Sequence, residues 1–202
     1  MSFFENTRKP VGLGGKIMVA MMNFGHSAMA AWGLHFLQLA PDAMVLDCGC
    51  GGGANIKTLL KLCPKGKVQG IDYSAVSVEK ARKVNARAIA AGRCTMQQAS
   101  VAELPFEAEQ FDVVTAFETV YFWPELAQNF REVYRVLKPG GIFFICNEAN
   151  GETAKGDKWT QIIDGMAIYT GTALKEYLEK AGFCQIQSHK NKKGWLCVTA
   201  QK

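Results

Sequence analysis

A glycine-rich stretch near the start of the chain constrains its fold more than any other feature. Residues 45–55 read VLDCGCGGGAN, with four glycines in the five positions from Gly49 to Gly53. Each glycine in regular structure costs about 0.5–1 kcal/mol relative to alanine, so a cluster indicates a turn that something approaches closely. Apolar residues precede the cluster and a segment with helical spacing follows it. The pattern predicts a strand, a tight turn and a helix, with a ligand against the turn.

The rest of the chain alternates between short apolar runs and helical patterns. This alternation predicts an α/β fold with a doubly wound, mostly parallel sheet. A short turn joins the last two strands, which predicts an antiparallel C-terminal hairpin. Seven strands are predicted over residues 45–47, 67–72, 94–98, 111–117, 141–147, 183–190 and 194–200. The main helices are predicted over residues 55–62, 75–91, 125–137 and 172–182.

Composition bounds the domain organisation and the compartment. With 202 residues and 49% hydrophobic content, one ligand-binding domain over 41–202 is expected, preceded by a helical cap or lid over 1–40. Seven cysteines, an odd number without a C-x-x-C pair, indicate reduced thiols and a cytoplasmic protein. A loose likeness to a signal peptide around IMVAMMNFG is the alternative, and Glu5 and Lys16 argue against it.

The same features argue against several partners. No histidine lies close in sequence to Cys48 and Cys50, so no metal is expected. No uninterrupted apolar run approaches the ~20 residues that span a bilayer, so no membrane contact is expected. The net charge of +5 is mostly scattered, which argues against a nucleic-acid partner.

Two cofactors fit a glycine turn at the end of a first strand. Gly49, Gly51 and Ala54 match the G-x-G-x-x-A pattern of dinucleotide-binding folds, and Asp72 follows at the distance of a ribose-binding acid. S-adenosylmethionine is the other cofactor, because its binding folds share the strand, the turn and the acid. The glycine pattern by itself therefore leaves a NAD-dependent oxidoreductase open.

Four motifs in order resemble those of the class I S-adenosylmethionine-dependent methyltransferases, especially the small type 11 group. They read VLDCGCGGG, GIDYS, LPFEAEQFDVV and REVYRVLKPGG, and the last two have no counterpart in a dinucleotide fingerprint. The resemblance covers roughly residues 43–147. It implies S-adenosylmethionine as cofactor, S-adenosylhomocysteine as product and methyl transfer as the reaction.

The resemblance also implies which residues contact the cofactor. Asp72 would accept hydrogen bonds from both ribose hydroxyls, and Asp47 would lie near the methionine amino end or hold the loop structurally. Ser100 stands where family members often carry an acid for the adenine amino group, and a neutral hydroxyl should bind it more weakly. The predicted cofactor-binding residues are Asp47, Gly49, Gly51, Gly53, Asp72, Tyr73, Ser100, Val101 and Phe117.

Candidates for the acceptor side follow the fourth strand, in the stretch FETVYFWPE. In related enzymes a pair of residues before this proline often faces the methyl group, and here Tyr121 and Phe122 hold those positions. The catalytic candidates are Tyr121, Glu118 and His26, the last as a general base. Each has a structural alternative, in the core or on a solvated loop. In-line methyl transfer depends on alignment more than on a base.

A second wall of the acceptor site is predicted over residues 147–169, with Glu148 and Trp159 as candidates. The N-terminal segment is predicted to cover the site or to serve only as packing, through Met21, Met22, His26, Met29, Trp32 and His35.

A small-molecule acceptor is predicted, since no N/D-P-P-Y motif, Pro-Cys pair or added RNA-binding module is present. RNA methylation and non-catalytic cofactor binding are the alternatives. The acceptor, the methylated atom and the oligomeric state are left open.

Overall fold

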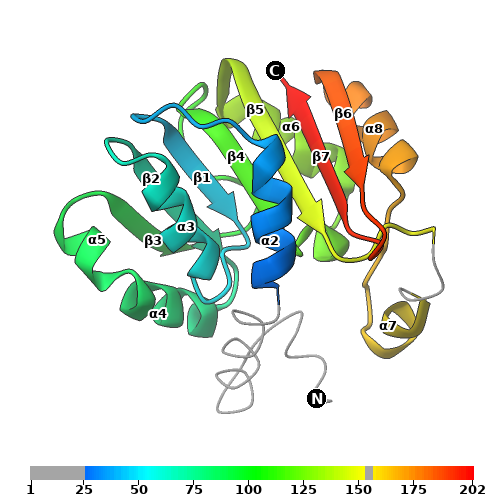
Figure 1. Cartoon of the computed structure of the whole chain (residues 1–202), viewed down its shortest axis with the longest axis horizontal. Coiled ribbons are helices and arrows are strands. Elements are labelled where there is room, and N and C mark those ends of the chain that lie inside the picture. The colour runs from blue at the N-terminus through cyan, green and yellow to red at the C-terminus, as the bar shows by residue number, and fades with distance from the viewer. Residues whose placement is uncertain (1–25, 153–156) are drawn as a thin grey trace.

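A central seven-stranded sheet organises the part of the chain that the computed structural model describes, residues 26–152 and 157–202. The strands are β1 (Met44–Cys48), β2 (Lys67–Asp72), β3 (Cys94–Gln98), β4 (Phe111–Phe117), β5 (Leu137–Asn147), β6 (Cys184–Lys190) and β7 (Leu196–Gln201). Their order across the sheet is β3-β2-β1-β4-β5-β7-β6 (Figure 1). β7 is antiparallel to both of its neighbours and the other neighbouring pairs are parallel. The predicted doubly wound sheet with an antiparallel C-terminal hairpin is confirmed.

Helices cover both faces of the sheet. They are α2 (Ser27–Gly33), α3 (Ala54–Leu62), α4 (Ala75–Val84), α5 (Ala86–Ala90), α6 (Leu126–Val136), α7 (Asp157–Ile162) and α8 (Gly171–Lys180), with short 3-10 turns η2 (Leu34–Phe36) and η3 (Val120–Phe122). α2, α3 and α4 pack on one face, and α6 and α8 pack on the other (Figure 1). The predicted α/β layering is therefore present.

Alternating side chains of the strands build a core on each face. Phe143 packs in the core under α6 and α8, whereas the next residue, Phe144, packs in the core under α2 and α3. Both phenylalanines are fully buried, and burial of each contributes about 1.5–3 kcal/mol. This alternation fixes the register of β5 and holds its carboxyl end at one edge of the sheet.

The N-terminal helix of the described region packs directly on this second core. α2 lies across the sheet beside α3 (Figure 1), with Met29 and Ala30 buried. A Cβ atom on Gly33 would lie 2.4 Å from Cys146 Sγ, so glycine at this position allows the helix to approach β5. Met21 and Met22 lie outside the described residues, so the division into a cap and a domain stays a prediction.

Two element boundaries differ from the sequence-based prediction. The single helix predicted over 75–91 is two helices, α4 and α5, which meet at Asn85 with φ −109°. Asn85 Nδ2 donates to Gly53 O at 2.9 Å, so this break ties the helix to the glycine turn. β5 begins at Leu137 rather than Gly141, because Leu137 pairs with Phe111 before the chain passes through the KPGG turn.

Candidate functional site

The candidate site lies at the edge of the sheet where the parallel strands end. The chain winds in opposite directions from β1 and β4, and such a switch point is where ligands bind in open α/β sheets. Asp47 lies near the end of β1 and Asp72 ends β2, while Glu118 and Glu148 directly follow β4 and β5. Four acidic side chains thus gather along one edge.

The glycine turn connects β1 to α3 and is fixed to the neighbouring strand. The backbone N–H groups of Gly49 and Cys50 each donate to Ile71 O at 2.9 Å. Gly49, Gly51 and Gly53 have φ of +79°, +50° and +78°, in the left-handed region that L side chains rarely adopt. The positive φ values alone favour glycine at all three positions.

The surroundings of these three glycines differ. A Cβ on Gly49 would lie 2.2 Å from Thr119 Oγ1, and a Cβ on Gly53 would lie 2.6 Å from Asn85 Nδ2. A Cβ on Gly51 would meet no described atom within 4 Å. Close packing against other residues therefore explains why glycine is needed at positions 49 and 53. Among the described residues, Gly51 instead faces space that a ligand can occupy. Contact of all three with a cofactor stays a prediction.

Asp72 joins the end of β2 to the glycine turn. Its Oδ2 accepts from Gly51 N at 2.9 Å and its Oδ1 accepts from Ser74 N at 2.8 Å. Burial raises the pKa of Asp72 above its ordinary value, and the backbone hydrogen bonds from Ser74 and Gly51 oppose that shift. Each carboxylate oxygen accepts more than one hydrogen bond, so both can also receive hydroxyl donors of a ligand.

Asp47 is buried, and only one of its two carboxylate oxygens has a hydrogen-bond partner among the described residues. Its Oδ1 accepts from Thr115 Oγ1 at 2.7 Å, across the register that pairs the two residues on β1 and β4. Its Oδ2 is shielded from solvent and has no hydrogen-bond partner among the described residues. Burial raises the pKa of Asp47 to about 7, the Thr115 bond opposes this, and the charge of Asp72 adds to it. An unmatched buried acceptor costs about 1–3 kcal/mol, which favours a ligand donor at this position.

The remaining predicted cofactor residues have varied surroundings. Ser100 is exposed, and its Oγ accepts from Ala102 N at 3.2 Å. Val101 belongs to the core under α6, and the Phe117 ring lies 5.3 Å from that of Phe144. Tyr73 is 39% exposed. These contacts assign protein-internal roles to Ser100, Val101 and Phe117, and their contact with a cofactor stays a prediction.

The three catalytic candidates lie together. The Tyr121 hydroxyl donates to Glu118 Oε1 at 3.2 Å and accepts from Ala149 N at 2.9 Å. The backbone N–H of Glu148 also donates to Glu118 Oε1. His26 Nδ1 lies 3.3 Å from Glu148 Oε1 and 3.7 Å from Glu118 Oε2. The structure therefore joins His26, Glu118 and Tyr121 with Glu148, and their catalytic role stays a prediction.

The proximity of these groups alters their titration. Burial raises the pKa of Glu118 to about 7, although the charge of His26 and the hydrogen bonds from Glu148 N and Tyr121 oppose the change. Burial alone would lower the pKa of His26, but the contact with Glu148 and the charge of Glu118 outweigh it and raise the value. Burial also raises the pKa of the Tyr121 hydroxyl well above its usual range, so this group stays protonated.

Several other predicted residues lie outside this cluster. Trp123 is a core residue, stacked 6.1 Å from Phe143. His35 is exposed and bonds through Nδ1 to Ala31 O at 2.8 Å. The side chain of Trp159 lies outside the described residues. Sequence reasoning missed Thr115, Thr119 and Asn85, because their partners are distant in sequence and no motif marks them.

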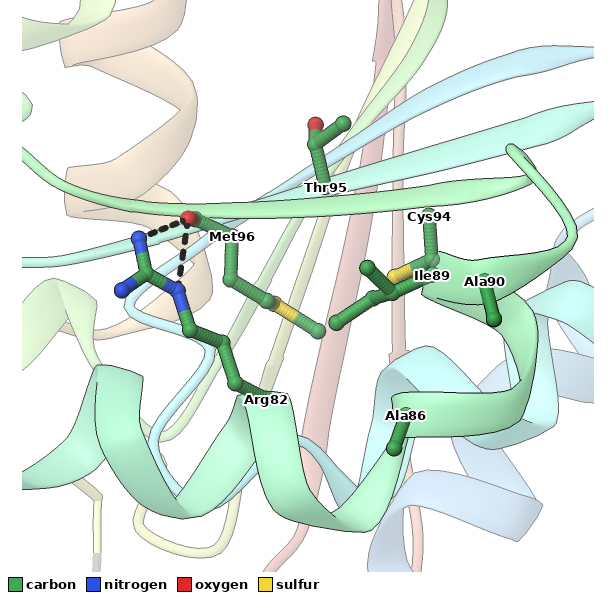
Figure 2. Close-up of a pocket in the computed structure, with 7 residues that line it drawn as sticks. All are labelled: Arg82, Ala86, Ile89, Ala90, Cys94, Thr95 and Met96. Carbon is green, nitrogen blue, oxygen red and sulfur yellow. Dashed lines mark hydrogen bonds between the residues drawn. The ribbon is translucent and has the colours of Figure 1, made fainter.

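A separate hollow lies at the outer edge of the sheet, against β3. Its volume is about 500 Å³, and its lining residues come from α4, α5 and β3 (Figure 2). Arg82 crosses one end and donates to Met96 O from Nε at 3.2 Å and from Nη2 at 2.8 Å. The lining is otherwise mostly apolar, and none of the predicted site residues belongs to it.

The chain resembles known methyltransferases in sequence. A family model described as a methyltransferase domain matches residues 46–145, which include the glycine turn and β4. The Arabidopsis thaliana cycloartenol-C-24-methyltransferase is 30% identical over 164 residues, which cover 74% of this chain and 48% of that protein. The Botryococcus braunii botryococcene C-methyltransferase is 35% identical over 108 residues, 54% of this chain and 28% of that protein. The chain thus spans less than half the length of these curated relatives.

Solved structures share the fold across nearly the whole chain. A S-adenosylmethionine-dependent methyltransferase from Aquifex aeolicus gives a TM-score of 0.76 at 20% identity, covering 92% of this chain and 97% of that one. The Haemonchus contortus phosphoethanolamine N-methyltransferase 2 gives 0.80 at 16% identity, covering 100% of this chain and 60% of that one. At such identities the likeness concerns the fold alone.

The strand order, the glycine turn and the acid at the end of β2 define the class I S-adenosylmethionine-dependent methyltransferase fold. Within that class, the chain belongs to the type 11 methyltransferase family. In residues 26–152 and 157–202, no helix combines the length and apolarity that crossing a bilayer requires.

Proposed function

We propose that this protein transfers the methyl group of S-adenosylmethionine to a small-molecule acceptor. The observation that carries the proposal is the arrangement of Asp72, Asp47 and Gly51 at the switch point of the sheet. Asp72 offers a carboxylate, Asp47 offers a buried oxygen without a partner among the described residues, and a Cβ on Gly51 would meet no described atom within 4 Å. These features fit the ribose diol and the ammonium end of the cofactor, which need acceptors, and the close approach of its body to the backbone.

Different residues bind the cofactor and the acceptor. S-adenosylmethionine, when bound, supplies a methyl group on a sulfonium cation. Asp72 accepts from the ribose hydroxyls, and Asp47 accepts from the amino end. Glu118, directly after β4, and Tyr121, in η3, form the wall against which the acceptor is aligned with the methyl group. Such alignment of the reacting atoms accounts for much of the barrier reduction in a displacement of this kind.

The relatives support a small molecule as the acceptor. The named acceptors among the similar proteins include a sterol, a linear terpene and an aminoalcohol phosphate, as in the cycloartenol, squalene and phosphoethanolamine methyltransferases. These methyltransferases differ in the atom that they methylate. We therefore propose only that the acceptor is a small molecule, and we do not propose its chemical class. The cytoplasm is the proposed compartment, since all seven cysteines are free thiols and six of them are buried.

A transfer assay tests this proposal. The purified chain is incubated with methyl-labelled S-adenosylmethionine and separate pools of sterols, linear terpenes, amino-alcohol phosphates and total RNA. The proposal predicts formation of S-adenosylhomocysteine and a labelled product with one small-molecule pool. Label only in RNA would favour the RNA alternative, and cofactor binding without transfer to any pool would favour a non-catalytic binder.

A further inference from the structure

We propose that His26, Glu118 and Glu148 form a binding site for one divalent transition-metal ion. The three residues come from separate segments, the start of α2 and the ends of β4 and β5. One ligand atom from each lies within 4.8 Å of the other two. An imidazole nitrogen and two carboxylate oxygens form a mixed donor set that suits zinc, manganese or ferrous iron.

The spacing of the ligand atoms matches a shared ion. Ligands about 2.0–2.2 Å from a metal, at angles of 90–120°, lie roughly 3.0–3.7 Å from one another. His26 Nδ1 lies 3.3 Å from Glu148 Oε1 and 3.7 Å from Glu118 Oε2. Both distances to Nδ1 fit ligands of one ion, and the ligand oxygens of the two glutamates lie within 4.8 Å of each other, so side-chain movements would bring all three residues to a single ion.

The surroundings of the His26 imidazole nitrogen Nδ1 also favour a metal ion. Nδ1 of His26 is shielded from solvent, and no group among the described residues is in hydrogen-bonding geometry with it. Yet two carboxylates flank this atom at close range. A cation between the three groups would give this nitrogen a partner, since a buried polar atom without one is costly.

The environment of Glu118 holds its second oxygen toward His26. Both the Tyr121 hydroxyl and the Glu148 N–H donate to Oε1, which leaves Oε2 as the oxygen nearest to His26. The Tyr121 hydroxyl is itself fixed by Ala149 N at 2.9 Å. Hydrogen bonds of this kind orient ligands in metal sites. Glu118 also has φ +57°, and a non-glycine residue in this region often marks a functional position.

The charge of the cluster and its partial exposure also suit a divalent ion. One protonated histidine can neutralise only one of two carboxylates, whereas a divalent ion neutralises both. The side chains of His26, Glu118 and Glu148 are 29%, 14% and 40% exposed, so the cluster lies near the surface although Nδ1 itself is shielded. Three protein ligands leave at least one coordination position open, as in catalytic rather than structural zinc sites. The sequence does not reveal this site because its ligands are far apart along the chain.

Metal titration of the full chain, without S-adenosylmethionine, tests the site. After treatment with a chelator, the protein is titrated with Co²⁺ by visible absorption and with Zn²⁺ by calorimetry. The expected result is one ion per chain, with at least 100-fold weaker binding in His26→Ala and Glu148→Gln. The matched controls are His35→Ala, an exposed histidine further along the chain, and Glu152→Gln, a surface acid paired with Lys190. Both controls are expected to bind like the wild type.

Either of two results would overturn the proposal. One is the absence of stoichiometric binding to the folded wild-type chain. The other is binding that His26→Ala and Glu148→Gln leave unchanged while both variants retain the wild-type thermal unfolding profile. The measurement needs no cofactor or acceptor, so its failure leaves the proposed methyl transfer untouched. Failure of methyl transfer would likewise leave metal binding unaffected.

Discussion

Asp72 is the residue on which the proposed cofactor recognition depends most. It is the carboxylate at the end of β2, and its two oxygens already receive the amides of Gly51 and Ser74. A hydrogen bond to a charged group contributes about 1.5–3 kcal/mol. Replacement Asp72→Ala should therefore weaken S-adenosylmethionine binding by roughly 2–4 kcal/mol, measured by calorimetry. Asp42→Asn, an exposed acid that precedes β1, is the control and should bind normally. Unchanged affinity in a folded Asp72→Ala protein would contradict the ribose assignment.

Asp47 makes stability depend on pH. Its pKa in the folded protein is raised to about 7, against an ordinary value of 3.8, because the side chain is buried. Between these values the folded state holds a proton that the unfolded state has lost, so stability falls as pH rises from about 4 to about 7. Below pH 4 Asp47 is protonated in both states, so its ionisation costs the folded protein no stability.

Replacement Asp47→Asn removes this titration and keeps a partner for Thr115. Denaturant unfolding at pH 5 and pH 8 should show the variant gaining stability relative to wild type at the higher pH. A tenfold difference in proton affinity between the folded and unfolded states corresponds to about 1.4 kcal/mol, so a gain of a few kcal/mol is expected. If the free energy of unfolding changed equally in both proteins between pH 5 and pH 8, Asp47 would be ionised over this whole range and would have a hydrogen-bond donor at its second oxygen.

At the level of elements, substitutions in the glycine turn are predicted to distinguish an effect on ligand binding from an effect on folding. Gly51 and the remote Gly92 both have positive φ, of +50° and +69°, and at neither would a Cβ meet an atom of the described residues within 4 Å. Gly51→Ala and Gly92→Ala should therefore destabilise the fold to a similar extent, by about 1–2 kcal/mol. Only Gly51→Ala should weaken S-adenosylmethionine binding, because only its methyl group would enter the ligand space. Equal affinities in the two variants would contradict this assignment.

Gly53 should behave differently from Gly51. An added Cβ there would lie 2.9 Å from the Cα of Ala81, an atom of the α4 backbone that cannot rotate away. Gly53→Ala should thus lower the free energy of unfolding by more than Gly51→Ala does, typically by about 1–3 kcal/mol more. Chemical denaturation of both variants provides the comparison. A smaller loss in Gly53→Ala would show that α4 moves freely against the turn.

The elements also show where sequence patterns reach their limit. Apolar alternation and the glycine positions predict the strands and the turn, because these patterns are local. The break between α4 and α5 has no local signal. It depends on Asn85 reaching Gly53 from a distant part of the chain. The early start of β5 likewise depends on Leu137 pairing with Phe111.

At the scale of the whole molecule, the sheet brings together what the sequence keeps apart. The motifs identify Asp47 and Asp72 because they adjoin the glycine turn. His26, Glu118 and Glu148 follow different elements, and only the parallel order of β4 beside β5, with α2 packed across them, joins them. The sequence names these residues as separate candidates, but it contains no information on their mutual distances.

We expect the glycine turn to bind S-adenosylmethionine rather than a dinucleotide. Calorimetric titration of the purified chain with S-adenosylmethionine, S-adenosylhomocysteine and NAD distinguishes the two. The structure and the family predict micromolar binding of the first two, near about −8 kcal/mol, and no binding of NAD. Binding of NAD alone would contradict the account and would mean that the glycine pattern serves a dinucleotide.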